Sequence, residues 1–181
     1  DLFAGSQVGR RLPWIGVWAG PTGGCMHDTS TSRKLEKGDL VTVEIWSSHE
    51  HYSASAQGTL YIGDKPSREI LDTYSMLSEM YVATRDALKA GVTAEEPYNA
   101  ANRIYSNARG KDYYRTIGFS MGGGDVRLFK GNKSIIPGGM AFRVQSGIFS
   151  PLLIVICGTV VAGESGGEEI TTPLLSLKMK T

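Results

Sequence analysis

The side chains that suggest chemistry lie on two neighbouring predicted strands. The β-branched run at 41–45 and the segment at 52–62 flank a polar tip and predict a long hairpin. Its strands carry Glu44, Tyr52 and Gln57, where strands in a core normally carry apolar side chains. One such residue usually lies on a solvated strand face. Several of them on paired strands indicate a site, because a buried polar group needs a partner.

A histidine follows closely spaced glycines in the loop before this hairpin. His27 comes after Gly23 and Gly24, which allow the backbone to approach a ligand closely. An unperturbed imidazole has a pKa of about 6.5, so it can accept and donate a proton at neutral pH. A single loop histidine is more often a surface or capping residue. Pairing with Cys25 as a nucleophile is disfavoured, because side chains two residues apart on an extended segment point to opposite faces.

The composition excludes several classes of protein. The 181 residues are 41% hydrophobic and 20% charged, which suffices for one globular domain with a core. A net charge of +1, with both signs interspersed, offers no electrostatic surface for nucleic acid. The glycine-rich segment 115–124 lacks the Lys-Ser/Thr pair of a phosphate-binding loop.

Cysteine usage and hydropathy indicate the compartment. Cys25 and Cys157 have the spacing of neither a zinc motif nor a disulfide framework, which fits a reducing environment. No segment has the order of a signal peptide, and the apolar run 148–162 is too short and too interrupted to span a bilayer. We therefore expect a cytoplasmic protein without a membrane partner.

Two helices and further strands must position the candidate residues. Apolar residues at helical spacing predict a helix over 66–89 and a second over 94–109, the latter ending before Gly110. Strands are predicted at 17–19, 141–145 and 152–161. The expected order is a strand pair, two helices and further strand pairs.

Six short motifs follow one another in an order that resembles the creatinase/aminopeptidase family. They are 38–41, 52–59, 90–94, 115–122, 137–140 and 168–171. The resemblance implies the α/β (α+β) pita-bread fold, a curved antiparallel sheet with helices packed on one face. It also implies that 1–181 is a single domain of catalytic type that lacks the family's N-terminal helices and N-terminal domain.

The resemblance also assigns positions to the family's metal ligands. The metallopeptidases of the family bind two divalent ions through two aspartates, one histidine and two glutamates. At these five positions this chain carries, in order, Glu44, Ser55, Phe119, Gln145 and Glu168. A dinuclear site needs bridging carboxylates and several oxygen or imidazole ligands. We therefore expect neither a metal nor another cofactor, as in the metal-free branch that contains creatinase and ectoine hydrolase.

This branch implies a metal-independent hydrolase that cleaves a C–N bond in a small polar molecule. His27 would be the general acid/base, and Glu44 its anionic partner or a nucleophile. The substrate pocket would be lined by Tyr52, Gln57, Phe119, Gln145 and Glu168. One alternative is a catalytically silent pita-bread module that binds a peptide or protein. A third interpretation, ranked last, is a metallopeptidase similar to Xaa-Pro aminopeptidases.

A protein partner is also expected. Trp14, Trp18, Tyr113 and Tyr114 lie in or beside glycine-rich segments and outside the helical and strand stripes. Large aromatic residues outside a core are enriched in interfaces. The sequence therefore predicts a homodimer or a complementary N-terminal segment as partner.

Overall fold

One antiparallel sheet with two helices on one of its faces makes up the described chain. The computed structural model describes residues 14–21, 23, 32–50, 52–122 and 124–180. The first half of this part contains β1 (Trp14–Gly20), β2 (Leu40–His49), β3 (Tyr52–Ile62), α1 (Arg68–Ala87) and α2 (Glu95–Arg109). The second half contains β4 (Gly118–Ser120), β5 (Arg127–Leu128), β6 (Ala141–Ile148), β7 (Ile154–Ala162), β8 (Gly167–Glu169) and β9 (Lys178–Lys180).

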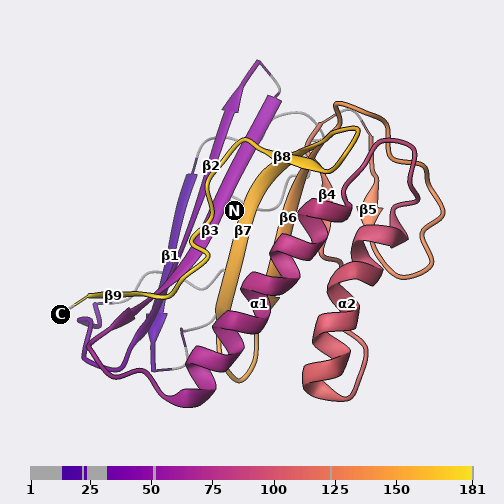
Figure 1. Cartoon of the computed structure of the whole chain (residues 1–181). Helices are drawn as coiled ribbons and strands as arrows, with labels where there is room; N and C mark the ends of the chain where they lie inside the picture. The colour runs from indigo at the N-terminus through magenta and orange to yellow at the C-terminus, as the bar shows by residue number, and fades with distance from the viewer. Residues whose placement is uncertain (1–13, 22, 24–31, 51, 123, 181) are drawn as a thin grey trace.

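The strand order brings the first and the last described strands into one sheet. It runs β1-β2-β3-β7-β6-β4-β5, with β8 beside β7 and β9 parallel to β3 (Figure 1). The predicted hairpin is confirmed, since β2 and β3 pair antiparallel from Leu40 opposite Tyr61 to His49 opposite Tyr52. The pairing of β3 with β7 then joins this hairpin to the strands that follow the helices.

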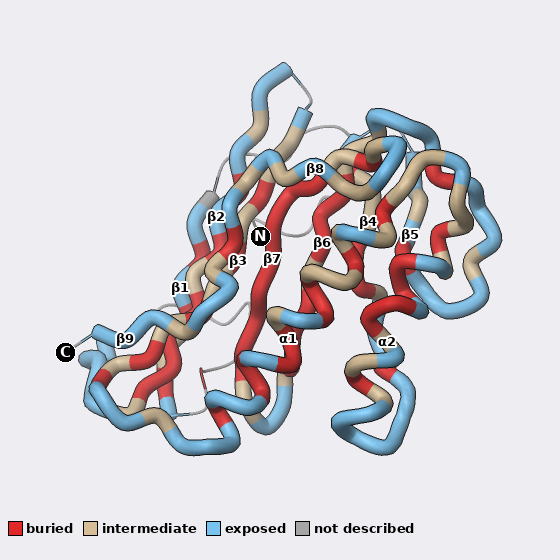
Figure 2. The backbone as a smooth tube through the Cα atoms, viewed as in Figure 1, coloured by how far each residue is buried: buried red, intermediate tan, exposed pale blue. Residues whose placement is uncertain are grey.

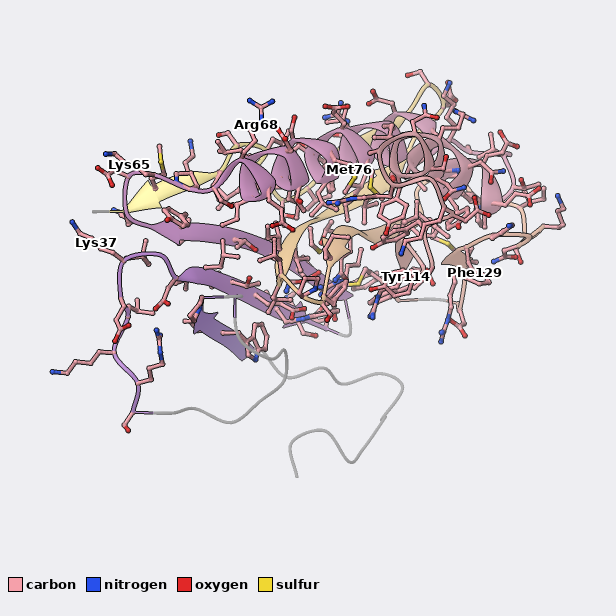
Figure 3. All side chains as sticks on the ribbon, turned by 90° about the horizontal axis from the view of Figure 1, so that it is seen from below. Lys37, Lys65, Arg68, Met76, Tyr114 and Phe129 are labelled. Carbon is pink, nitrogen blue, oxygen red and sulfur yellow. The ribbon has the colours of Figure 1, made fainter. Side chains whose placement is uncertain are left out.

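Both helices form where helical spacing predicts them. α1 begins at Arg68, two residues after the predicted start, because the Ser67 hydroxyl accepts a bond from the Ile70 N–H at 3.3 Å and caps the helix. α2 ends at Gly110, whose φ of 68° is left-handed and suits glycine. Figure 3 shows α1 and α2 together on one side of the sheet. Neither helix is both long and apolar enough to cross a membrane.

The main core lies between the helices and the middle strands. β7 is buried along most of its length (Figure 2). Apolar residues on α1 pack against the face of β6 and β7 that carries Phe142, Val144, Ile154 and Ile156. Residues alternate between the two faces of a strand, so Arg143 and Gln145 point away from this core.

Two of the four aromatic residues expected at an interface belong to the interior. Trp18 is 7% exposed and Tyr113 is 3% exposed. The Tyr113 hydroxyl donates to the Gly147 carbonyl at 2.7 Å, which explains how a tyrosine near glycines can be a core residue. Tyr114 is 59% exposed. The homodimer itself stays a prediction, but neither Trp18 nor Tyr113 is available to form it.

On the first two strands, polar residues are buried and several apolar residues are exposed, the reverse of the usual alternation. β2 buries Thr42, Glu44 and Trp46, whereas Ile45 between them is 47% exposed. The adjacent β1 exposes Ile15 and Val17. Polar residues therefore occupy the inner face of this hairpin, and their partners decide what the inner face can do.

Leu77→Ala should destabilise the protein by about 2–5 kcal/mol, because Leu77 on α1 is fully buried and its removal leaves a cavity. Leu71→Ala is the matched control, since Leu71 lies on the same helix and is 44% exposed. Urea denaturation followed by circular dichroism measures both. Equal losses in the two variants would contradict the placement of the core.

Candidate functional site

A row of polar side chains crosses four adjacent strands on the face opposite the helices. The register places Glu44 on β2 opposite Gln57 on β3, and Gln57 opposite Cys157 on β7. Cys157 in turn lies opposite Gln145 on β6. Arg143 is two residues from Gln145 and shares its face of the sheet. Two pairs of strands that lie far apart in the sequence thus place polar groups side by side on one face of the sheet.

Arg143 is the centre of this group. Its guanidinium donates from Nη1 to Glu44 Oε1, from Nη2 to Gln57 Oε1 at 2.7 Å, and from Nε to Gln145 Oε1 at 3.1 Å. Trp46 Nε1 donates to the same Glu44 oxygen at 2.7 Å. Arg143 and Glu44 are each 3% exposed. We call Glu44, Gln57, Arg143 and Gln145 the buried polar cluster.

Two aromatic rings lie against the guanidinium. Arg143 Cζ is 4.9 Å from the centre of the Trp46 ring and 5.9 Å from that of Phe119. The two rings are nearly parallel, with 17° between their planes. A cation over an aromatic face gains about 2 kcal/mol when water is excluded. The rings therefore help to keep a desolvated charge in place.

One oxygen of the buried polar cluster has no hydrogen-bond partner among the described residues. Glu44 Oε2 is buried, and no described group donates to it. An orphaned carboxylate oxygen is a reason to test whether a metal ion fits. The positive guanidinium on the other oxygen of the same carboxylate argues against a divalent ion there, because the two cations would repel each other.

The other positions that the resemblance assigns to metal ligands do not supply a metal site either. Ser55 Oγ lies 4.0 Å from Cys157 Sγ, and burial raises the pKa of the Cys157 thiol, which keeps it protonated. Phe119 presents a ring, and the Gln145 oxygen is already bonded to Arg143. No three His, Cys, Asp or Glu residues of the described chain are grouped so that they could hold a metal.

Glu168 lies far from the cluster. It is exposed on β8 and pairs with Val161, which is four residues beyond Cys157 on β7. Four residues along a strand span about 13 Å. The described donor set therefore does not fit the family's pair of divalent ions, and no step of a reaction can be assigned to them here.

The structure brings together only part of the predicted site. Glu44, Gln57 and Gln145 meet at Arg143, and Phe119 lies over it. Tyr52 is 78% exposed at the start of β3, and Glu168 is exposed on β8, so neither joins this group, and their predicted roles in a substrate pocket stay predictions. His27 lies outside the described residues. Arg143 was missed, although a charged residue between Phe142 and Val144 on a predicted strand was a signal for it.

A small cavity adjoins the buried polar cluster. Its volume is ≈ 100 Å³, and Tyr113, Arg115, Phe119, Gln145 and Phe149 are among the residues that line it. Arg115 Cζ lies 4.0 Å from the centre of the Phe149 ring, which holds the guanidinium at the cavity. None of the ion pairs between described residues involves Arg115.

Gln145 connects this cavity to the cluster. Its oxygen accepts the bond from Arg143 Nε, which leaves the amide NH2 to donate elsewhere. A guanidinium and an amide NH2 beside one small cavity are donors that suit a carboxylate. The cavity is smaller than the roughly 300–1,000 Å³ of a complete ligand pocket, so it can hold only one end of a ligand.

Comparisons with known proteins agree on the family and on the fold. The model of a family described as metallopeptidase family M24 matches residues 8–168. A probable dipeptidase PepE from Mycobacterium tuberculosis is 31% identical over 145 residues, which are 77% of this chain and 38% of that protein. An Xaa-Pro dipeptidase from Pyrococcus furiosus is 25% identical over 151 residues, 80% of this chain and 43% of that protein. The chain thus spans less than half the length of these relatives.

A solved structure confirms the predicted pita-bread fold. The crystal structure of dipeptidase PepE from Mycobacterium ulcerans matches with a TM-score of 0.80 and 28% identity, over 92% of this chain and 46% of that one. The α+β arrangement with helices on one face of an antiparallel sheet is therefore correct.

The predicted function is wrong. A metal-independent hydrolase of the creatinase and ectoine hydrolase branch was expected, whereas the relatives are named dipeptidases and Xaa-Pro dipeptidases of a metallopeptidase family. The error came from treating altered ligand positions as a sign of the metal-free branch. Of the three interpretations, the relatives favour the one ranked last, the peptidase-like one.

Arg143→Met should lower the free energy of unfolding by about 3–5 kcal/mol, because it leaves the Glu44 carboxylate buried without its cation. Urea denaturation measures the loss. Arg127→Met is the control, since the Arg127 side chain is 64% exposed and pairs with Asp125, a surface contact worth about 0–1 kcal/mol. Similar losses in both variants would mean that the buried pair contributes nothing.

Proposed function

The chain belongs to metallopeptidase family M24, and from that premise we propose that it binds the carboxylate end of a short peptide beside Arg115, without the family's metal-dependent hydrolysis. The observation that carries this proposal is the small cavity lined by both Arg115 and Gln145. The position of the cavity next to the buried polar cluster also supports the proposal.

Arg115 is suited to a carboxylate by charge and by geometry. The guanidinium fork can donate two parallel hydrogen bonds to the two carboxylate oxygens. Stacking on Phe149 restricts the side chain before a ligand arrives, so less conformational entropy is lost on binding. Gln145 also lines the cavity, and its amide NH2 is a further neutral donor.

The relatives supply the class of ligand. Proteins named dipeptidase and Xaa-Pro dipeptidase act on molecules that end in a carboxylate, and this chain covers part of their length. A cavity of ≈ 100 Å³ accommodates such a group with little else, so the remainder of the peptide would lie along the surface. A dipeptide is therefore the ligand that we propose.

Hydrolysis by the family's chemistry requires ligands that the described residues do not provide. A metallopeptidase uses its ions to activate water and to polarise the scissile carbonyl. In this chain Arg143 donates to Glu44 and to Gln145, two of the residues at ligand positions. The proposal is accordingly recognition of a peptide, with no bond cleaved by the described residues.

Binding of Ala-Pro to the purified chain, measured by isothermal titration calorimetry, tests the proposal. Arg115→Gln should weaken binding about 10- to 150-fold, since a hydrogen bond to a charged group is worth about 1.5–3 kcal/mol. The same loss is expected when the wild-type protein meets Ala-Pro amide, which lacks the carboxylate.

Arg68→Gln is the matched control, because Arg68 is exposed on α1 on the helical side of the sheet and pairs with Asp72 (Figure 3). It should leave binding unchanged. Equal affinity for the peptide and its amide, or no binding of either at millimolar concentration, would refute the carboxylate site. Release of free proline in the presence of Mn²⁺ would refute the absence of hydrolysis.

A further inference from the structure

We infer that the Arg143 guanidinium replaces the divalent ions of the family as a cation built into the chain. The inference rests on the buried polar cluster and stands apart from the peptide-binding proposal. Arg143 lies at the centre of the sheet, is 3% exposed, and directs three of its donors at side chains from β2, β3 and β6.

The position of the guanidinium supports replacement. Among the five positions that the resemblance assigns to metal ligands, Glu44 and Gln145 are hydrogen-bonded to Arg143. Phe119, at a third, presents its ring to the same cation. Three of the five positions thus surround one positive group, although none of them is adjacent to Arg143 in the sequence.

The balance of charge supports it as well. Two aspartates and two glutamates carry four negative charges, which two divalent ions neutralise. The corresponding residues near the cluster retain one carboxylate, Glu44, and Arg143 supplies one positive charge. Replacing Asp by Ser55 and Glu by Gln145 removes the negative charges that a single guanidinium could not neutralise, so these differences form one consistent set.

The shapes of the neighbouring side chains fit a guanidinium better than an ion. Gln57 and Gln145 both present amide oxygens, which accept from the planar fork. Trp46 and Phe119 offer ring faces, which attract a guanidinium and cannot ligate a divalent ion. Arg143 therefore supplies one positive charge, with matching hydrogen bonds and ring contacts, among the positions that correspond to the family's metal ligands.

If Arg143 replaces the metal ions, restoring acidic residues at the ligand positions should not by itself restore metal binding. Putting acids back, in the variant Ser55→Asp/Gln145→Glu, should not create a strong metal site while Arg143 remains, because the guanidinium pairs with the new carboxylates. Adding Arg143→Met should then raise the affinity for Mn²⁺ at least about 10-fold, measured by calorimetry with Mn²⁺ alone. Arg127→Met in the same acidic background is the control and should leave the affinity low.

A second measurement avoids the acidic variants, in case they do not fold. A double-mutant cycle compares the thermal midpoints of Arg143→Met, Glu44→Gln and the double variant in the otherwise native chain. The double variant should lose clearly less than the sum of the two single losses, because each charge is costly only when the other has been removed.

Wild-type protein analysed by mass spectrometry after gel filtration should carry less than about 0.1 transition metal ion per chain, well below the one or two of a metal centre. About one or two ions per chain that Glu44→Gln removes would overturn the inference. Equal Mn²⁺ affinity of the acidic variant with and without Arg143, or additive losses in the cycle, would also overturn it.

Discussion

The ion pair between Arg143 and Glu44 is the interaction on which the inner face of the sheet depends. The two residues are 99 positions apart and join β6 to β2 across β7 and β3. Removing two charges from water is costly, and their mutual attraction compensates only if the remaining donors are also satisfied. Gln57, Gln145 and Trp46 provide further bonds, so the polar residues of β2, β3 and β6 form one interdependent unit.

This dependence explains which parts of the molecule could be predicted from sequence. The helices and the β2–β3 hairpin follow from local spacing, from a serine cap at 67 and from a glycine at 110, all of which act within a few residues. The partners of Glu44 are set by long-range pairing of strands. Arg143 could have been noticed as a charge in an apolar run, but its partner could not, because no local pattern encodes a contact across 99 residues.

The differences between these expectations and the structure have the same origin. Glu168 was placed in the pocket by position along a motif, whereas the register of β8 against β7 sets it about 13 Å away. Tyr113 was assigned to an interface because of its glycine-rich surroundings, whereas its hydroxyl is bonded inside the domain. The wrong prediction of a metal-independent hydrolase has a different cause. Loss of ligand residues is a local observation, and kinship to dipeptidases is carried by the whole scaffold, so the ligands alone pointed to the wrong branch.

The inverted alternation of the first hairpin has a consequence for handling the protein. β1 is at the edge of the described sheet, and its outward residues Ile15 and Val17 are 68% and 60% exposed beside Ile45 on β2. An edge strand with unpaired backbone groups and β-branched side chains on its open face is a template for strand addition between molecules. Among the described residues, β1 thus presents a surface suited to strand addition, and Val17→Lys would place a charge there that opposes it.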